Sequence, residues 1–345
     1  MANNEIKANE IEVIFETITP LYTGDAWQES KEIRPSSLIG SLRFWFEVIC
    51  YFGGVCSERD FDKEKGRFEK EISQEEFKKR LSKHGTDFEG QIKAVKELEI
   101  PLPAIIFGTT GWKSLIEIKK INFNDENFEE VKNTRIISGK NWFWKKIEYN
   151  GEFKVIFKVP EEIKEAIFFP LLNFMDKYGY WGGSWNVGYG RLKVKKIKIN
   201  NQSIERTDWQ KNEFDFSKFG KNKVSVNDIE ESVSFKNLTS NNIDKITKIL
   251  STKKVKKIQI EDFNSDIKEA IQKLIEMKAK LRKKYKLKIQ NDEVMRHKIF
   301  GYLKPTEGSK ILPYINTLEN NTYECGLLSI AGILNLYQEP KNEQQ

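Results

Sequence analysis

The chain has few residues of the kinds that most often carry out acid–base, redox or metal chemistry. Of its 345 residues, only two are histidine (His84 and His297) and three are cysteine. Histidine is the side chain that titrates closest to neutral pH, so two copies leave little capacity for general acid–base catalysis. The cysteines, Cys50, Cys56 and Cys325, contain no C-x-x-C pair. This sparse, odd set argues against structural zinc or a disulfide framework and is typical of a reducing cytoplasm.

Long apolar segments are also missing. No apolar run approaches the roughly eighteen residues that a membrane-spanning helix needs. Residues 1–7 have no apolar core of the kind found in secretory signal peptides. These absences predict a cytoplasmic protein without a membrane partner.

Aromatic residues and basic charge, in contrast, are well represented. The 23 Phe, 11 Tyr and 8 Trp residues can fill sizeable cores. Because 345 residues are many for one core, we expect two domains, residues 1–200 and 201–337, and a disordered tail over 338–345. Lys and Arg exceed Asp and Glu by 58 to 51, and the net charge of +7 permits a polyanionic partner without requiring one.

The first 200 residues alternate between strand and helix patterns. Alternating apolar residues predict strands over 11–16, 115–118, 153–159 and 192–199. Helical spacing predicts one helix over about 36–51 and another from Pro160 onward, kinked at Pro170. Strand, helix, strands, helix, strand is the order of a ferredoxin-like sheet with its helices on one face. In the last strand the alternation slips by one between Val194 and Ile197, which predicts a β-bulge.

Three polar stretches interrupt or follow this order. Residues 57–99 are charged, with amphipathic pieces near 74–81 and 91–98, and predict a helical insertion in the first domain. Residues 122–133 predict a loop or finger. Residues 200–227 predict a linker or a covering loop.

The second half contains a long amphipathic helix over 265–285 and strands near 311–315 and 326–333. The end of this helix is dense in basic residues, namely Lys278, Lys280, Arg282, Lys283, Lys284, Lys286 and Lys288. Such a cluster is either a solvated helix end, favoured by the helix dipole, or a stripe that contacts nucleic acid.

The start of the first helix is suited to anion binding. A helix N-terminus carries unsatisfied N–H groups and a partial positive charge. Ser36 and Ser37 can add hydroxyl donors, and Arg34 and Arg43 can flank a phosphate with guanidinium forks. Gly40 shares a face with Arg43, where a missing side chain lets a backbone or base approach. The structural alternative is a capped amphipathic helix with two solvated arginines and a close helix–sheet contact at Gly40.

A second segment, far along the chain, is rich in glycine: Gly182-Gly183-Ser184-Trp185-Asn186-Val187-Gly188-Tyr189-Gly190-Arg191. Its glycines permit unusual backbone conformations, and successive N–H groups can form a nest for phosphate. It is no Walker loop, because no Gly-Lys-[Ser/Thr] follows, and it leads into a strand, unlike a dinucleotide-binding fingerprint. The alternative is a tight helix-to-strand connection. We refer to residues 182–191 as the glycine loop.

Read as one site, the two segments predict binding of RNA. Arginines would position phosphates and the glycines would admit the backbone. Trp181, Trp185 and Tyr189 offer stacking platforms, and an aromatic such as Trp185 would stack on a base. The predicted RNA-binding residues are Arg34, Ser36, Ser37, Gly40, Arg43, Gly182, Gly183, Trp185, Gly188, Gly190 and Arg191.

These segments resemble the RAMP (repeat-associated mysterious protein) superfamily of CRISPR systems. The resemblance rests on the stretch from Ile33 to Trp45, the Thr19-Pro20-Leu21-Tyr22-Thr23-Gly24 turn before it, Ile106-Phe107-Gly108, and the glycine loop with Arg191. It covers roughly residues 11–199, with further support from residues 297–301. The Arg43-Phe44-Trp45 ending most resembles the first-numbered subunit of the Cmr complex, the type III-B effector. In contrast to the basic residues common in family loops, residues 184–187 have none.

The resemblance implies an α+β protein with two tandem ferredoxin-like, RRM-related domains. It implies a non-catalytic subunit that binds guide RNA near its 3′ end, target RNA, or both, beside other Cmr subunits in an antiviral ribonucleoprotein. We expect no cofactor and no metal. Two alternatives stay open: a metal-independent endoribonuclease with His297 as acid or base, and a scaffold whose basic surface binds acidic proteins.

Overall fold

The structure, a computed structural model, describes residues 8–24, 31–137, 140–210, 213–220, 254–259, 263–288, 296–297, 300, 302–303, 306–307, 309–317 and 322–329. The α-helices are α1 (Pro35–Phe52), α2 (Gln74–His84), α3 (Phe88–Glu97), α4 (Leu102–Phe107), α5 (Glu161–Ile163), α6 (Phe169–Lys177), α7 (Arg206–Trp209) and α10 (Phe263–Lys288). The strands of the first part are β1 (Ala8–Thr17), β2 (Phe61–Asp62), β3 (Arg67–Phe68), β4 (Glu117–Phe123), β5 (Phe128–Ile137), β6 (Lys140–Tyr149), β7 (Glu152–Pro160), β8 (Leu192–Ile199) and β9 (Gln202–Ile204). Those of the second part are β10 (Lys254–Gln259), β11 (Tyr302–Leu303), β12 (Thr306–Glu307), β13 (Ile311–Thr317) and β14 (Thr322–Ser329).

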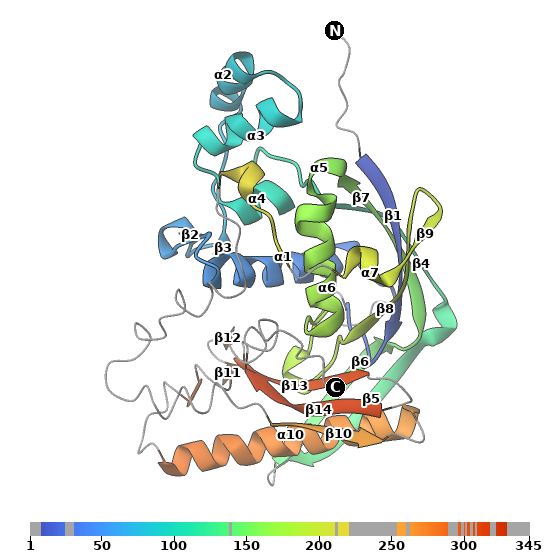
Figure 1. The fold of residues 1–345 in the computed structure, drawn as a ribbon. Coiled ribbons are helices and arrows are strands. Elements are labelled where there is room, and N and C mark those ends of the chain that lie inside the picture. Colours follow the sequence, from blue (N-terminus) through green and yellow to red (C-terminus); the bar gives the residue numbers. More distant parts are fainter. Residues whose placement is uncertain are drawn as a thin grey trace, which may run out of the picture.

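A five-stranded antiparallel sheet, in the order β4-β7-β1-β8-β9, organises the first 200 residues. Along the chain its main elements follow as β1, α1, β4, β7, α6 and β8. This is the β-α-β-β-α-β connection that the sequence predicts, and α1 and α6 lie on the same face of the sheet (Figure 1). The mixed α+β architecture is thereby confirmed, whereas a second ferredoxin-like domain and the domain boundaries stay predictions.

Alternating apolar residues place one face of the sheet against these helices. Ile11, Val13 and Phe15 of β1 are buried, as are Phe153, Val155, Phe157 and Val159 of β7. They share one hydrophobic core with Leu38, Leu42 and Trp45, which recur at helical spacing on α1. The amphipathic pattern of α1 therefore fixes which face of the helix turns to solvent, and Gly40 lies on that exposed face.

The predicted β-bulge in the last core strand is confirmed. Ile14 of β1 pairs with Lys196, but the next residue, Phe15, pairs with Val194, so Lys195 is the extra residue on β8. The bulge lets both Val194 and Ile197 point into the core despite their odd spacing.

The second core helix is irregular near its predicted kink. α5 passes into a π-helical turn, Lys164–Phe168, before α6 begins, and Pro170 lies in the first turn of α6. Proline has no backbone N–H to donate, and π-turns absorb such interruptions within a continuous helix.

The predicted insertion contains α2 and α3, preceded by the short β2–β3 hairpin that the sequence did not reveal. The two helices stand apart from the sheet, beyond α4 (Figure 1). The stretch predicted as a loop or finger is the end of β4, a 3-10 turn at Asp125–Asn127 and the start of β5, which pairs with β6 as a long hairpin.

The C-terminal part contains a three-stranded antiparallel sheet, β10-β14-β13, with α10 beside it. The predicted long helix and two strands are present, while β10 was missed. Leu312, Tyr314 and Leu328 of this sheet belong to the same core as the first sheet. In the stretch predicted as a linker or covering loop, Trp209, Phe214, Phe216 and Phe219 are buried in that core. Residues 221–227 and the predicted tail lie outside the described residues.

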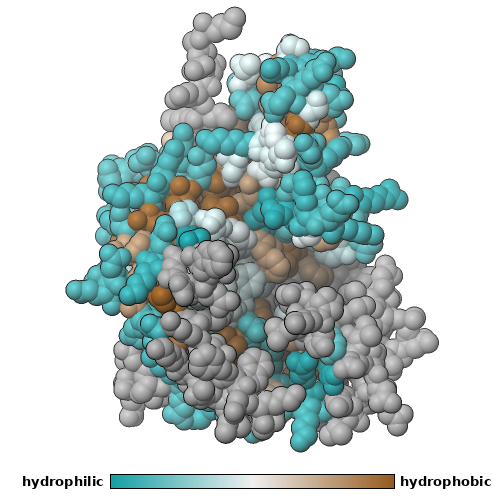
Figure 2. Space-filling view, turned by 180° about the vertical axis from the view of Figure 1, so that it is seen from behind, coloured by the Kyte–Doolittle hydropathy of each residue, from teal (hydrophilic) through white to brown (hydrophobic). Residues whose placement is uncertain are grey.

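Seen from behind, the described surface is mainly hydrophilic, with hydrophobic residues showing mostly near the middle (Figure 2). Among the helices in the described part of the chain, none is both long enough and apolar enough to span a membrane.

Candidate nucleic-acid interface

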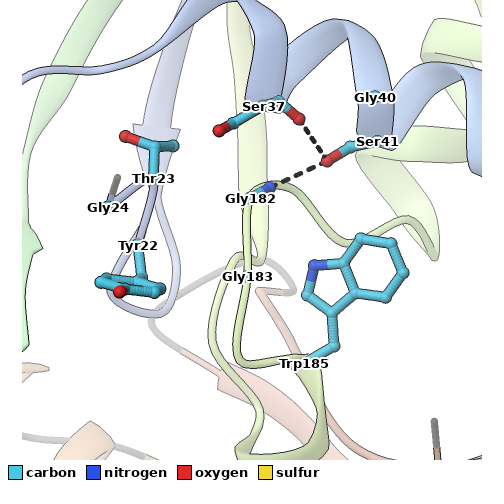
Figure 3. A pocket seen from close by; sticks show the side chains of 9 residues that line it. All are labelled: Tyr22, Thr23, Gly24, Ser37, Gly40, Ser41, Gly182, Gly183 and Trp185. Atoms are coloured by element: carbon cyan, nitrogen blue, oxygen red, sulfur yellow. Dashed lines mark hydrogen bonds between the residues drawn. The ribbon is translucent and has the colours of Figure 1, made fainter. Parts of the chain in front are cut away.

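The two predicted segments, separated by about 140 residues, meet in space and line an open pocket of about 320 Å³. α1 forms its roof, and the glycine loop lies opposite (Figure 3). The pocket is lined by Tyr22, Thr23, Gly24, Ser37, Gly40, Ser41, Gly182, Gly183 and Trp185. Five of these were predicted as RNA-binding residues. Tyr22, Thr23, Gly24 and Ser41 were not, although the turn that holds the first three is part of the family resemblance.

Two hydroxyl groups fix the walls of the pocket. The Ser41 hydroxyl donates to the Ser37 carbonyl at 2.8 Å and accepts the Gly182 N–H at 2.9 Å, which ties α1 to the glycine loop. The Thr23 hydroxyl donates to the Glu32 carbonyl at 2.7 Å and accepts the Arg34 N–H at 3.3 Å. The turn before α1 is thereby joined to the start of the helix.

Glycine is required at two positions of the loop. Gly182 has φ +68°, and a Cβ atom there would lie 2.3 Å from the Tyr22 carbonyl oxygen. Gly190 has φ +86°, and its Cβ atom would lie 2.0 Å from the Trp181 carbonyl oxygen. Any side chain would therefore collide with backbone as well as strain it. The loop closes where the Trp181 N–H donates to the Gly190 carbonyl at 2.8 Å.

The glycine N–H groups are already used inside the protein. Besides the bond from Gly182 to Ser41, Gly183 donates to the Tyr22 carbonyl at 2.7 Å, Gly188 to the Trp185 carbonyl at 2.9 Å and Gly190 to the Pro20 carbonyl at 2.8 Å. These four groups consequently do not form the phosphate nest that the sequence suggested. Their bonds hold the loop against the 20–22 turn.

Aromatic rings lie on two sides of the pocket. Trp185 packs on Trp45 with ring centroids 5.9 Å apart and meets the edge of Phe44 at 5.1 Å. Its indole N–H donates to the Trp181 carbonyl at 3.2 Å, which fixes the ring orientation. Tyr22 lies across from Trp185, on the other side of the loop backbone (Figure 3). The predicted stacking residue is therefore held rigidly and half-buried in the pocket wall.

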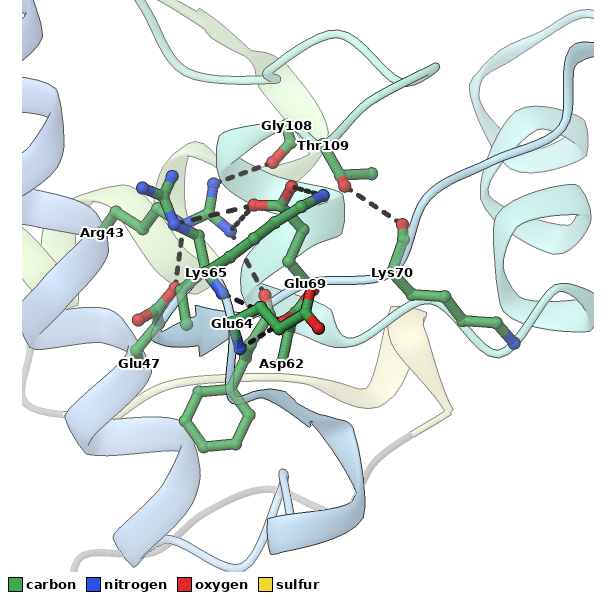
Figure 4. A network of polar contacts seen from close by, with 11 residues as sticks. Arg43, Glu47, Asp62, Glu64, Lys65, Glu69, Lys70, Gly108 and Thr109 are labelled. Carbon is green, nitrogen blue, oxygen red and sulfur yellow. Dashed lines mark hydrogen bonds and ion pairs between the residues drawn. The ribbon is translucent and has the colours of Figure 1, made fainter.

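Arg43 does not line the pocket. Its guanidinium group donates to the Glu47 carboxylate at 2.8 Å, to the Gly108 carbonyl at 2.9 Å and to the Phe68 carbonyl at 3.2 Å (Figure 4). It also lies 3.3 Å from Glu69 of the insertion. Burial raises the pKa of Glu47, and Arg43 opposes this rise. The geometry thus gives Arg43 a structural role, joining α1 to the insertion.

Arg191 is fully buried, contrary to the expectation of a phosphate contact. Its guanidinium group donates to the carbonyls of Ile315 at 3.1 Å, Lys177 at 2.7 Å and Gly179. The rings of Tyr180 and Tyr314 lie 5.3 and 5.2 Å from its central carbon. This geometry leaves no face of the guanidinium group to a phosphate, so Arg191 does not enter the site proposed below.

The remaining predicted residues lie outside the pocket lining. Arg34 is half-buried and precedes the first turn of α1, where Ser36 is exposed. Gly188 and Gly190 are buried, and the Cα of Gly188 faces Pro313. His297, the candidate acid or base, is half-buried and is not among the residues that line the pocket.

The pocket itself carries no charged side chain. Hydroxyl groups, glycine backbone and two aromatic rings surround it, and such groups suit a base or a ribose better than a bare phosphate. None of the lining side chains is an Asn, Gln, Arg, Asp or Glu. Those are the side chains that most often discriminate between bases, so contacts here would tolerate many sequences.

Several solved structures are similar to this chain at low identity. The apo form of Cmr1 from Pyrococcus furiosus aligns with a TM-score of 0.38 and 13% identity, covering 92% of this chain and 87% of that chain. A chain of a type IV-B CRISPR complex aligns with a TM-score of 0.34 and 12% identity, covering 57% of this chain and 92% of its own. A chain of the type III-B Cmr-beta complex bound to cognate target RNA aligns with a TM-score of 0.28 and 15% identity, covering 56% and 61%.

Membership of a family rests on sequence. No curated protein sequence matches the chain. The model of the RAMP superfamily, in contrast, matches residues 14–193, more than half of the chain. The matched region runs from β1 to β8 and holds α1, the insertion, α6 and the glycine loop. The chain therefore belongs to the RAMP superfamily.

Proposed function

We propose that this chain is a non-catalytic, RNA-binding subunit of a type III-B (Cmr) CRISPR effector ribonucleoprotein. Its partners would be guide RNA, near the 3′ end, or target RNA, together with other RAMP subunits. Membership of the superfamily supports the CRISPR setting. In this proposal residues 201–337 form a second ferredoxin-like domain. The observation that carries the RNA role is the pocket in which α1 and the glycine loop meet.

The proposed contact is made by a nucleoside that enters this pocket. Trp185 and Tyr22 offer ring surfaces, and stacking on aromatic side chains accepts any base because every base has a π-face. Gly40 leaves open space, with no atom within 4 Å of where its Cβ would be. Tolerance of sequence suits a subunit of an assembly in which the guide RNA, by base pairing, reads the target.

Gly40 allows a direct test, because a side chain there would fill the pocket without disturbing the core. We expect Gly40→Phe to weaken binding of fluorescein-labelled single-stranded RNA about tenfold in an anisotropy titration, since one stacked base contributes about 1–3 kcal/mol. Ser82→Phe, on the exposed surface of α2, is the matched control and should bind normally. A folded Gly40→Phe variant with unchanged affinity would refute the pocket as the RNA site.

The variant Gly40→Ala shows whether a change in RNA affinity comes from a filled pocket or from an altered stability of α1. Alanine adds one methyl group in open space and favours the helix over glycine by about 1 kcal/mol. This variant should therefore unfold at a higher temperature and keep most of its RNA affinity.

The non-catalytic part of the proposal has its own test. Labelled repeat RNA incubated with EDTA-treated protein should stay intact. Cleavage that disappears in His297→Ala would instead support the endoribonuclease interpretation.

A further inference from the structure

A neutral pocket cannot by itself balance the charge of an RNA strand, so the positive charge must lie elsewhere. The segment 277–288, in the second half of α10, contains seven basic residues and no acidic residue. Seven is also the net charge of the whole chain, so the rest of the sequence is neutral in sum. The excess charge of this protein is therefore concentrated in three turns of one helix.

The basic residues in the two halves of α10 differ in their ion pairing. In the first half, Lys268 pairs with Glu129 at 3.6 Å and Lys273 with Glu269 at 2.5 Å. In the second half, Lys278 and Arg282 are one turn apart on the same face, where like charges repel. Neither forms an ion pair with an acidic residue in the part of the chain that the structure describes.

The helix dipole does not account for this arrangement. Its effect falls off within the last turn, and Lys278 lies about 15 Å before the end of α10 at Lys288, given the rise of an α-helix. Burial and the neighbouring Arg282 lower the pKa of Lys278 to about 7. Burial and Arg296 likewise lower the pKa of Arg282. A bound anion would relieve this repulsion between neighbouring cations.

The second half of α10 contacts the glycine loop directly. Lys278 Nζ donates to the carbonyl of Asn186 at 3.0 Å. Asn186 follows Trp185, whose ring lines the pocket. Val187, Ala279 and Tyr22 all pack against one hydrophobic cluster. A strand that leaves the pocket past Trp185 would thus meet Lys278 first and Arg282 one turn later.

We propose that Lys278 and Arg282, with Arg296 beside them, form a phosphate-binding site for the RNA strand whose nucleoside occupies the pocket. This inference rests on the proposed function. It adds the site at which the negative charge of the RNA backbone would be neutralised. The RNA would be bound at two neighbouring sites. The pocket receives a base and ribose through neutral groups, and α10 binds the adjoining phosphates through cations that lack an acidic ion-pair partner among the described residues.

The test compares two double variants that remove the same charge from one helix. Lys278→Gln with Arg282→Gln should weaken binding of labelled oligouridylate at least tenfold. It should also reduce the slope of log affinity against log salt by about 1.4, since each phosphate contact on a single strand contributes about 0.7. The control, Lys268→Gln with Lys273→Gln, removes cations already paired with acids and should change both quantities far less. Lys278→Arg with Arg282→Lys, which keeps the charge, should retain most of the affinity.

Each other outcome is informative. Equal losses in both double variants would show a diffuse effect of charge and overturn the site, as would unchanged binding in Lys278→Gln with Arg282→Gln. Displacement of RNA by polyglutamate at equal charge concentration would overturn it in favour of an acidic protein partner. Gly40→Phe distinguishes the two proposals: if it abolishes binding while the α10 variants do not, the pocket stands and the α10 site fails. If the wild-type protein binds no RNA, both fail.

Discussion

Ser41 and Gly182, 141 residues apart, are joined by a 2.9 Å hydrogen bond in which the serine hydroxyl accepts the glycine N–H. The same hydroxyl donates back to the Ser37 carbonyl of its own helix. One small side chain thus couples α1 to the glycine loop at the pocket.

Replacing Ser41 tests this coupling. Ser41→Ala should lower the free energy of unfolding by about 1–3 kcal/mol, because the Gly182 N–H loses its acceptor in a half-buried position. RNA affinity should fall as well, since the loop is freed from the helix. Urea unfolding and anisotropy measure the two effects. Ser82→Ala removes a hydroxyl that bonds only to the exposed α2 backbone and should change neither; a Ser41→Ala variant that behaves the same way would contradict the coupling.

We expect Arg191 to contribute to the stability of the fold and not to RNA binding. Lysine has fewer donors and no planar fork, so Arg191→Lys cannot satisfy the carbonyls of Ile315, Lys177 and Gly179 together. Each carbonyl left without a donor should cost about 1–3 kcal/mol of unfolding free energy. The same change at Arg206, whose side chain is 49% exposed, should have little effect. A fully stable Arg191→Lys variant with lost RNA binding would restore the phosphate contact that the sequence suggested.

Glu148 should make stability depend on pH. Burial raises its pKa, and the hydrogen bond from Tyr189 of the glycine loop only partly opposes the rise. A carboxyl whose pKa is higher in the folded than in the unfolded state binds its proton more tightly when folded, so stability falls as the pH rises through the folded-state pKa. Glu148→Gln should therefore unfold at a higher temperature than wild type at about pH 8 and at a similar temperature at about pH 4.

The control for Glu148 is Glu129→Gln, which changes an exposed carboxylate beside the same Lys268. It should lower stability slightly at about pH 8 by removing an ion pair. If Glu148→Gln were destabilising at every pH, the result would contradict this prediction. The buried carboxylate would then stabilise the fold as a hydrogen-bond acceptor, and its desolvated charge would not be destabilising.

Lys278 should make RNA binding depend on pH. Its pKa of about 7 leaves it partly neutral near neutrality, and a phosphate favours the charged form, so binding takes up a proton. Affinity should therefore fall between about pH 6 and about pH 8. Among the described residues, the groups known to face Lys278 are the Asn186 carbonyl and Arg282, with Arg296 next to Arg282. Lys278→Arg stays charged throughout and should give a flatter profile; an identical slope would assign the pH dependence to another group.

The predictions from sequence succeeded where periodicity carries the information. The alternation of Val194 and Ile197 was enough to place a bulge, because a strand that buries one face must keep its apolar residues on that face. The spacing of Leu38, Leu42 and Trp45 likewise gave α1 and, with it, the exposed position of Gly40.

Prediction failed where the partner of a side chain is distant in sequence. Nothing local to Arg43 indicates that Gly108 and Phe68 will accept its hydrogen bonds, and nothing near Arg191 indicates Ile315. Both arginines were therefore predicted to contact phosphates. Ser41 was missed for the same reason, since its hydroxyl matters only once Gly182 arrives beside it.

The burial of Arg191 has a practical consequence for anyone who wishes to dissect the protein. Its guanidinium group is clamped by the Ile315 carbonyl and the Tyr314 ring, both from β13 near the far end of the chain. A fragment that stops after the first sheet would lose both contacts and would uncover the apolar core residues on which Leu312, Tyr314 and Leu328 pack. Expression trials that cut the polypeptide in two should accordingly yield insoluble N-terminal pieces, and truncation is the wrong tool for assigning RNA contacts to either half.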